Sequence, residues 1–330
     1  MILTTSTLSA QSGSYPGSFA RLGFGARGLS MGNAMVSNIF TDVSGNYNPA
    51  LACFQEQGIV DVGYTFMSLD RKLNFLGFAK KFMIPGQKSS GAGITLGWIN
   101  SGVGNIDGRD NDSRELGILS TFENQFDLAT SFLLSDQVAI GIGFKLYYAK
   151  LYDKVTTNSI AFDLGTIYKA TDELAFGLSI RDISAKYKWE TSVIYGSLGT
   201  TTINKFPTLW DFGASYKLPK NSGSVSLQFE YQVNPIIEDK INGLSSKRDN
   251  TVIVKIGGEY FLNEHLLIRA GIDRINLKSK DFMGNLKPGL GIKFGKSFTK
   301  DIILALEYSF QFEPYTKSPI QNIGVNFKFK

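Results

Sequence analysis

Residues 302–312 read IILALEYSFQF. Every second residue from Ile302 to Phe312 is apolar or aromatic, and from Ala305 onward the residues between them are small, polar or charged. Side chains of a β-strand point to opposite faces in turn, so this alternation predicts a strand with one apolar face. A tilted strand needs about 9–11 residues to cross a bilayer, whereas strands of soluble proteins have about 5–6. The stretch therefore predicts a membrane-crossing strand.

The same alternation recurs along most of the chain, for example in residues 138–148 and 225–233. Counting such runs predicts an all-β, fourteen-stranded antiparallel transmembrane β-barrel. The even strand number places both ends of the barrel on one side of the membrane, as bacterial barrels require. The expected strands are 58–68, 72–83, 91–100, 123–134, 137–150, 158–170, 173–184, 206–218, 223–233, 250–261, 265–276, 286–296, 301–312 and 320–330.

The connections between these strands alternate in length. Short links such as 135–136 and 263–264 predict periplasmic turns, and long links such as 101–122 and 185–205 predict extracellular loops. This asymmetry predicts a barrel in a bacterial outer membrane with both termini in the periplasm. The alternative is a soluble β-sandwich, which would need a second sheet to cover each row of aromatic residues.

Composition narrows the classes of function. The net charge is +5 over 330 residues, and the basic residues are scattered, so nucleic acid is not an expected partner. No stretch approaches the roughly 18 apolar residues of a transmembrane helix. The single cysteine, Cys53, can form no internal disulfide.

The N-terminal part does not follow the strand pattern. Residues 1–11 resemble the remnant of a signal peptide, with small residues before Gln11, and a disordered tail is the alternative. Residues 12–57 mix small and apolar residues, and Pro49 suits the start of a short helix. A fourteen-stranded barrel is too wide for its own side chains to fill. Residues 12–57 are therefore expected to form a plug inside a barrel built from residues 58–330.

Several short motifs point to chemistry, and each is better explained by structure. Residues 23–28 spell G-x-G-x-x-G without the strand and helix of a dinucleotide site, so close packing explains these glycines better. The acidic loop 107–112 lacks the spacing of a calcium-binding loop. The only histidine, His265, lies in a predicted turn on the periplasmic rim, away from any catalytic partner. We expect no enzymatic activity, no cofactor and no metal.

Charged residues occur on the predicted inward faces with mixed signs. They predict a lattice of salt bridges that supports the wall and the plug, and a selectivity filter is the alternative. A lysine or arginine on the lipid face would cost about 2–4 kcal/mol near the midplane, which supports this register. The inward residues are Asp127, Lys145, Asp163, Lys169, Arg181, Asp211, Glu230, Lys255, Glu259, Arg269, Lys293 and Glu307.

Residues 26–34 (ARGLSMGNA), 42–44 and 47–52 (YNPALA) resemble the start of PorV/PorQ-type outer-membrane proteins, which are similar to the wider FadL-like group. Residues 143–146 and 161–165 are similar to the same pattern. The resemblance implies a fourteen-stranded barrel with an N-terminal plug. The plug residues that carry it are Ala26, Arg27, Gly28, Met31, Gly32, Asn48, Pro49 and Ala50.

The resemblance implies two candidate roles. The first is a non-enzymatic component of type IX protein secretion that binds exported proteins or secretion partners. Its docking surface would lie on the long loop 185–205, with Tyr187, Trp189 and Tyr195.

The second role is passive transport of long-chain fatty acids or other hydrophobic small molecules. It predicts an apolar pocket beneath the loops and a gap in the wall, beside a strand kinked at Gly91, Gly93 and Gly97. A barrel with only a structural role in the outer-membrane lipid is the third option.

Overall fold

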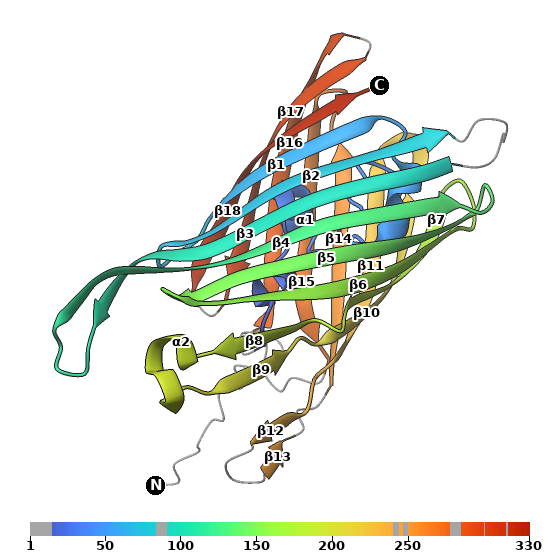
Figure 1. Ribbon diagram of the computed structural model, residues 1–330. Coiled ribbons are helices and arrows are strands. Elements are labelled where there is room, and N and C mark those ends of the chain that lie inside the picture. Colours follow the sequence, from blue (N-terminus) through green and yellow to red (C-terminus); the bar gives the residue numbers. More distant parts are fainter. Residues whose placement is uncertain are drawn as a thin grey trace, which may run out of the picture.

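The computed structural model describes residues 15–83, 91–239, 244–246, 250–277, 285–299, 301–314 and 316–330. Fourteen antiparallel strands form one closed barrel, in which the first strand pairs with the last (Figure 1). The barrel strands are β1 (Gly58–Phe66), β2 (Arg71–Met83), β3 (Gly91–Arg109), β4 (Glu115–Leu133), β5 (Val138–Tyr152), β6 (Val155–Lys169), β7 (Leu174–Ile183), β10 (Thr208–Lys217), β11 (Gly223–Val233), β14 (Thr251–Phe261), β15 (Leu266–Asn276), β16 (Lys287–Thr299), β17 (Ile302–Glu313) and β18 (Ser318–Phe329). The predicted strand count is confirmed.

The wall separates side chains as the alternation predicts. In β17, Leu306 is 58% exposed on the outer face, whereas Ala305, Glu307 and Ser309 are buried on the inner face. No helix among the described residues is long and apolar enough to cross a membrane. In β17 the outer face is therefore apolar and aromatic, and the inner face is small and polar.

The two ends of the barrel differ. At the end that we call the long-connection end, β7 and β10 are joined through β8 (Lys186–Glu190), α2 (Ser192–Tyr195), η3 (Gly196–Leu198) and β9 (Thr201–Lys205). The small sheet of β12 (Ile237–Asp239) and β13 (Leu244–Ser246) lies at the same end, at the bottom of Figure 1. The opposite, short-turn end carries tight links such as η4 (Pro219–Asn221) and the C-terminus.

One expected loop is a paired hairpin instead. Residues 101–122 were expected to be unpaired, but β3 and β4 continue as a ladder to Arg109 opposite Glu115. The end of β3 has glycines at 102, 104 and 108 among polar residues, whereas Leu116, Ile118 and Phe122 share one face of β4. Main-chain pairing needs no apolar face on β3, so the alternation in that strand could not reveal the extension.

Residues 15–57, which we call the N-terminal segment, lie inside the barrel (Figure 1). The segment contains η1 (Ser18–Arg21), α1 (Gly25–Ser30) and η2 (Pro49–Phe54). Helix α1 packs on β1 and β15–β18, and η2 packs on β2–β6, so the segment touches opposite parts of the wall. As predicted, Pro49 starts a short helix after an extended Asn48, whose φ is −154°.

The segment runs from one end of the barrel to the other. Gly17 lies against Phe206 at the long-connection end, and Gly58 pairs with Phe329 at the short-turn end. The described residues nearest to the N-terminus therefore lie opposite the C-terminus along the barrel. The expected signal-peptide remnant, residues 1–11, lies outside the described residues, and the periplasmic location of both termini stays a prediction.

Candidate functional site

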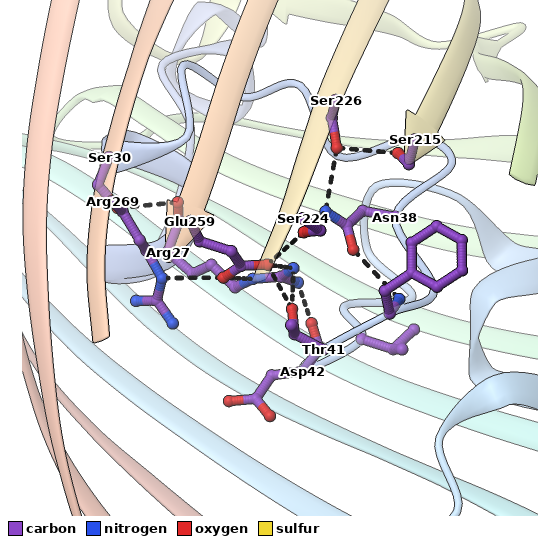
Figure 2. A network of polar contacts seen from close by, with 12 residues as sticks. Arg27, Ser30, Asn38, Thr41, Asp42, Ser215, Ser224, Ser226, Glu259 and Arg269 are labelled. Carbon is purple, nitrogen blue, oxygen red and sulfur yellow. Dashed lines mark hydrogen bonds and ion pairs between the residues drawn. The ribbon is translucent and has the colours of Figure 1, made fainter. Parts of the chain in front are cut away.

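The N-terminal segment is joined to the wall by buried charges. Arg27 on α1 forms an ion pair with Glu259 on β14, with Arg27 Nη2 and Glu259 Oε1 2.5 Å apart (Figure 2). Arg269 on β15 holds the other oxygen of Glu259 at 3.3 Å, and Thr41 and Ser224 donate hydrogen bonds to Glu259. A carboxylate with this many donors is fully compensated in its buried position.

Asp42 forms a second anchor on the same side. Its carboxylate contacts Lys293 on β16 and Lys328 on β18. Burial alone would raise the pKa of Asp42, but the two lysines hold it well below its ordinary value. Lys293 also pairs with Glu307 at 3.2 Å, which ties this anchor into the charges of the wall.

Asn48 anchors the segment on the opposite side. Its Nδ2 group donates to the carbonyl oxygens of Val36, Thr166 and Leu178 at 2.9, 3.2 and 3.3 Å. Its Oδ1 accepts a hydrogen bond from the backbone N–H of Ala50 at 3.0 Å. One buried side chain therefore links two turns of the segment to β6 and β7.

The wall makes room for the backbone of the segment. A Cβ atom on Gly165 would lie 2.0 Å from Asn48 Oδ1, and one on Gly257 would lie 2.2 Å from the carbonyl oxygen of Met31. Real Cβ atoms do not approach so closely, so only glycine fits at these positions. The segment and the wall thus pack as one body.

The structure brings the predicted plug residues into two groups, all buried. Ala26, Arg27, Gly28, Met31 and Gly32 lie towards β14–β18, and Asn48, Pro49 and Ala50 lie towards β3–β6. Cys53 is also buried, as a small core residue.

The predicted salt-bridge lattice is present. Lys145 pairs with Asp163 at 2.8 Å, and Arg181 pairs with Asp211 at 2.7 Å. Glu230, Lys255, Glu259, Arg269 and Glu307 are also buried on the inner face, and Lys293 is partly buried there. The last two predicted members have other partners. Lys169 lies at the rim and pairs with Asp172 at 2.6 Å, and Asp127 accepts hydrogen bonds from Gln125 and Asn46.

The predicted docking residues are not on one surface. Tyr187 is only 2% exposed, and its hydroxyl donates to Glu123 at 3.1 Å. Burial and the Glu123 charge raise the pKa of Tyr187. Trp189 is half-buried against Tyr187, and Tyr195 alone is exposed, at 63%. The prediction that Tyr187 belongs to an exposed surface is therefore wrong, because the β8–β9 hairpin folds against the inner face of β6.

Tyr187 belongs instead to an aromatic cluster at the long-connection end. Phe206 lies 4.9 Å from both Tyr147 and Tyr187, and Phe19 of the N-terminal segment packs on Tyr147 at 6.4 Å between ring centroids. We call these four residues the aromatic cluster. It covers the lumen with apolar rings that come from four different parts of the chain.

Three basic side chains gather near this cluster, inside the lumen. Arg21 on η1 is buried beside Arg274 on β15, which donates to the Arg21 carbonyl oxygen at 3.5 Å. Lys287 on β16 is 2% exposed, and the positive charge of Arg274 is close enough to repel it. Burial lowers the pKa of Arg21. We call Arg21, Arg274 and Lys287 the basic cluster.

The carboxylates near the basic cluster, which are Asp182, Glu230, Asp273 and Glu313, act on it at longer range than an ion pair. Among the described residues, none of its three members forms an ion pair, and Arg274 Nε is buried without a hydrogen-bond partner. Asp273 is buried beside the cluster and accepts hydrogen bonds from Asn33 and from the N–H of Arg274. Buried charge without a counterion is costly, so the cluster is suited to an anionic group.

Cavities lie at both ends of the barrel. At the long-connection rim, a cavity of about 380 Å³ is lined by Ala185, Phe206, Val233 and Pro235, among others. At the short-turn end, another of about 290 Å³ lies beneath Thr41 and Asp42. The N-terminal segment occupies the lumen between them.

Sequence reasoning missed the basic cluster. Its signal is a pair of adjacent charged residues in a strand, Asp273-Arg274, which cannot both face inward with regular alternation. Arg274 has a φ of +62°, and the register with β14 shifts between Val254 and Ile256. A β-bulge therefore brings Arg274 into the lumen.

His265 is exposed at the short-turn rim, where its Nδ1 lies 3.1 Å from the carbonyl oxygen of Gly295. In the part of the chain that the structure describes, no group of three or more His, Cys, Asp or Glu residues is arranged to hold a metal ion.

Comparison with solved structures places the fold. No protein-family model matches the sequence, and no curated protein matches it. The fold is similar to the Pseudomonas putida toluene transporter TodX (TM-score 0.60, 13% identity, covering 93% of this chain and 98% of that one). It is similar to the Ralstonia pickettii toluene transporter TbuX (TM-score 0.60, 12% identity) and to a Pseudomonas aeruginosa FadL homologue (TM-score 0.61, 10% identity). Each of these two alignments covers 93% of this chain and 98% of the other.

Proposed function

We propose that this protein is a non-enzymatic barrel of a bacterial outer membrane that passively admits hydrophobic small molecules, and that it favours those with an anionic group, such as long-chain fatty acids. The observation that carries the preference is the basic cluster, in which Arg21 and Lys287 are buried and Arg274 is partly buried. Arg21 lies on the same short helix as Phe19 of the aromatic cluster. An amphipathic anion offers an acyl chain to the rings and a carboxylate to the cations.

The outer face of the barrel supports the membrane location. Leu306, Phe212 and Ile142 are each about half-exposed on strands of ordinary membrane-crossing length. A soluble protein would leave a very large apolar surface in contact with water. The fold shared with two toluene transporters and a FadL homologue supports the same placement and a transport role.

The N-terminal segment acts as the plug in this proposal. Arg27 and Asp42 anchor it on one side and Asn48 anchors it on the other, so it is held across the lumen. Water-filled passage of ions and sugars is then blocked. An apolar molecule does not need a water-filled pore, since it can move between apolar surfaces by small displacements of the segment or the wall.

Binding measurements with the purified protein test the preference for anions. We expect oleate to bind, and Lys287→Met and Arg274→Met each to weaken binding about tenfold or more, because a hydrogen bond to a charged group contributes about 1.5–3 kcal/mol. Toluene, which has no charge, should bind equally to all three proteins. Lys220→Met, at an exposed turn on the short-turn end, is the control.

Two outcomes would contradict this proposal. If oleate and toluene bind alike and neither variant matters, the basic cluster is not an anion site. If cells that lack the protein take up labelled oleate and toluene at the normal rate, a transport role is excluded.

A protein-secretion role is a second candidate, favoured by one observation. The β8–β9 hairpin exposes apolar residues at its tip, including Tyr195 and Leu198, which is 86% exposed. Such residues suit contact with an exported protein or a secretion component. Isolation of the protein from native membranes under mild conditions, followed by identification of bound proteins, tests this role. Recovery without any secretion component or exported protein argues against it.

A further inference from the structure

A row of polar and aromatic residues crosses the outer face of β2–β4 near the long-connection end. Asn74 Nδ2 donates to Asn100 Oδ1 at 3.1 Å, and Asn100 Nδ2 donates to Asn124 Oδ1 at 3.0 Å. Trp98 Nε1 donates to the same Asn124 oxygen at 3.1 Å. These residues face outward, because the neighbouring Leu73 is buried on the inner face. The row continues through Tyr64 on β1 and Tyr148 on β5.

This row marks the boundary of the apolar surface. Towards the short-turn end, the outward residues that follow are apolar, for example Leu76, Leu96 and Phe126. Towards the long-connection end, the β1–β2 turn begins after Phe66. Tryptophan and tyrosine collect where a membrane meets water, and asparagine is costly within the hydrocarbon. The asparagine row therefore lies level with the lipid headgroups.

Two lysines lie on the next row towards the long-connection end. The register places Lys72, Gly102, Phe122 and Lys150 side by side on β2, β3, β4 and β5. Three strand spacings separate the two lysine backbones, about 14 Å. Gly102 has no side chain, so the Lys72 side chain lies near it, with Cε 3.7 Å from where a Gly102 Cβ would be. Lys150 Nζ lies 5.4 Å from the centroid of the Phe122 ring and 3.3 Å from Ser120 Oγ.

The charge of this surface is not balanced. Among the described residues, neither Lys72 nor Lys150 forms an ion pair, and neither row contains a carboxylate on its outer face. Asn124 uses its oxygen for two hydrogen bonds and its Nδ2 group has no acceptor among the described residues. The surface thus offers two positive charges and a hydrogen-bond donor at headgroup level.

We propose that this surface binds the phosphorylated headgroup of an outer-leaflet glycolipid of the lipid A type. Lys72 and Lys150 contact its phosphates, and Asn124 donates to a sugar hydroxyl or an ester carbonyl. The headgroup rests between the two lysines, over Phe122. The proposal depends on the outer-membrane location proposed above, with the long-connection end towards the outer leaflet, and it is independent of what passes through the barrel.

The charge and the spacing of the two lysines favour a lipid with two phosphates over a lipid with one. Each lysine near a membrane surface attracts an anionic lipid by about 1 kcal/mol, which is about fivefold in affinity. A lipid with two separated phosphates engages both lysines, whereas a lipid with one phosphate engages one.

The test uses the purified full-length protein in detergent and native mass spectrometry with diphosphoryl lipid A, monophosphoryl lipid A and phosphatidylglycerol. We expect diphosphoryl lipid A to bind most tightly. The single variants Lys72→Gln and Lys150→Gln should each weaken it about fivefold, and the double variant about 25-fold. The affinity for monophosphoryl lipid A should fall less in the double variant, because this lipid has one phosphate.

The matched control is Lys80→Gln combined with Lys220→Gln. Lys80 also lies over an aromatic ring, 5.1 Å from the centroid of Phe329, but near the short-turn end. This control should bind lipid A as the unchanged protein does. Equal binding of phosphatidylglycerol and diphosphoryl lipid A, or an equal loss in the control, would overturn the proposal.

A parallel measurement keeps the two proposals apart. Lys72→Gln with Lys150→Gln should bind oleate normally, because both lysines lie on the outer face, next to the inward-facing Leu73 and Ala149. Loss of lipid A binding with normal oleate binding supports the glycolipid site. Normal lipid A binding in this double variant rejects the site, whatever the oleate result.

Discussion

Asn48 shows how one residue couples the lumen to the wall. It is fully buried, and its amide group reaches carbonyl oxygens of β6 and β7 while its own backbone starts η2. The contact requires Gly165 opposite, whose missing Cβ leaves space for the amide. A buried amide with all its hydrogen bonds made is stable, but the same amide pushed away from its partners becomes a cost.

Gly165→Ala tests this coupling. The new Cβ would lie 2.0 Å from Asn48 Oδ1 and 2.9 Å from Pro49 Cδ, so the segment must shift. We expect the free energy of unfolding to fall by about 1–3 kcal/mol, as for other overpacked sites. Denaturant unfolding in detergent measures it. Gly295→Ala is the control, since its Cβ would meet Ala305 at an ordinary 3.5 Å. Equal stability of the two variants would show that the segment is loosely held.

At the scale of elements, irregularity in the strands places charge in the lumen. In β7, Asp182 has a φ of +61°, and the register with β6 shifts between Phe162 and Leu164. The bulge buries Arg181 and Asp182 together, next to one another in sequence. The strand β3 shows the opposite case. A kink at Gly91, Gly93 and Gly97 was expected, but β3 pairs with β2 without a shift, and Gly93 lies against Ala52 and Cys53 instead.

Removal of the β8–β9 hairpin is a test at the same scale. We expect replacement of residues 187–204 by a short glycine-serine linker to leave the barrel folded, because β8 and β9 pair with each other and not with the barrel strands. The change removes Tyr187 from the aromatic cluster. Stopped-flow measurement with a fluorescent fatty acid should then show faster association and faster release.

The control for this experiment uses the same kind of glycine-serine linker in place of residues 111–114, which are exposed at the tip of the β3–β4 hairpin. It should leave both rates unchanged. Identical rates for the two deletions would mean that the β8–β9 hairpin does not cover the binding region.

At the scale of the molecule, the strands of the barrel could be predicted from the sequence, but many of the contacts inside its lumen could not. All fourteen strands were found because lipid on one side and a polar lumen on the other impose alternation on each of them. Arg27 and Asn48 were found through their motif. Arg274 and Lys287 were not, because the adjacent charges Asp273 and Arg274 indicate a bulge at most, and the contact of Arg274 with Arg21 spans 253 positions.

Deletion of residues 15–57 tests the proposed plug. We expect the unchanged protein to be silent in planar bilayers and the deleted protein to conduct ions, because the lumen of fourteen strands is too wide for the wall side chains to fill. Cells should also become sensitive to vancomycin. If the deleted barrel does not fold, Arg27→Met with Asp42→Asn weakens one anchor in the full chain and should raise conductance less. Silence of a folded deletion variant would contradict the plug.

The pairing of β1 with β18 has a consequence for biogenesis. The N-terminal segment is synthesised first, yet Arg27 finds Glu259 only 232 positions later, and the seam closes only when Phe329 reaches Gly58. Until then, Arg27 and Asp42 have not formed their ion pairs with the wall. A barrel that closes with the segment outside can be corrected only by reopening the seam along the whole of β1, which is 9 residues long. The topology of the chain therefore requires the N-terminal segment to enter the lumen before β1 pairs with β18.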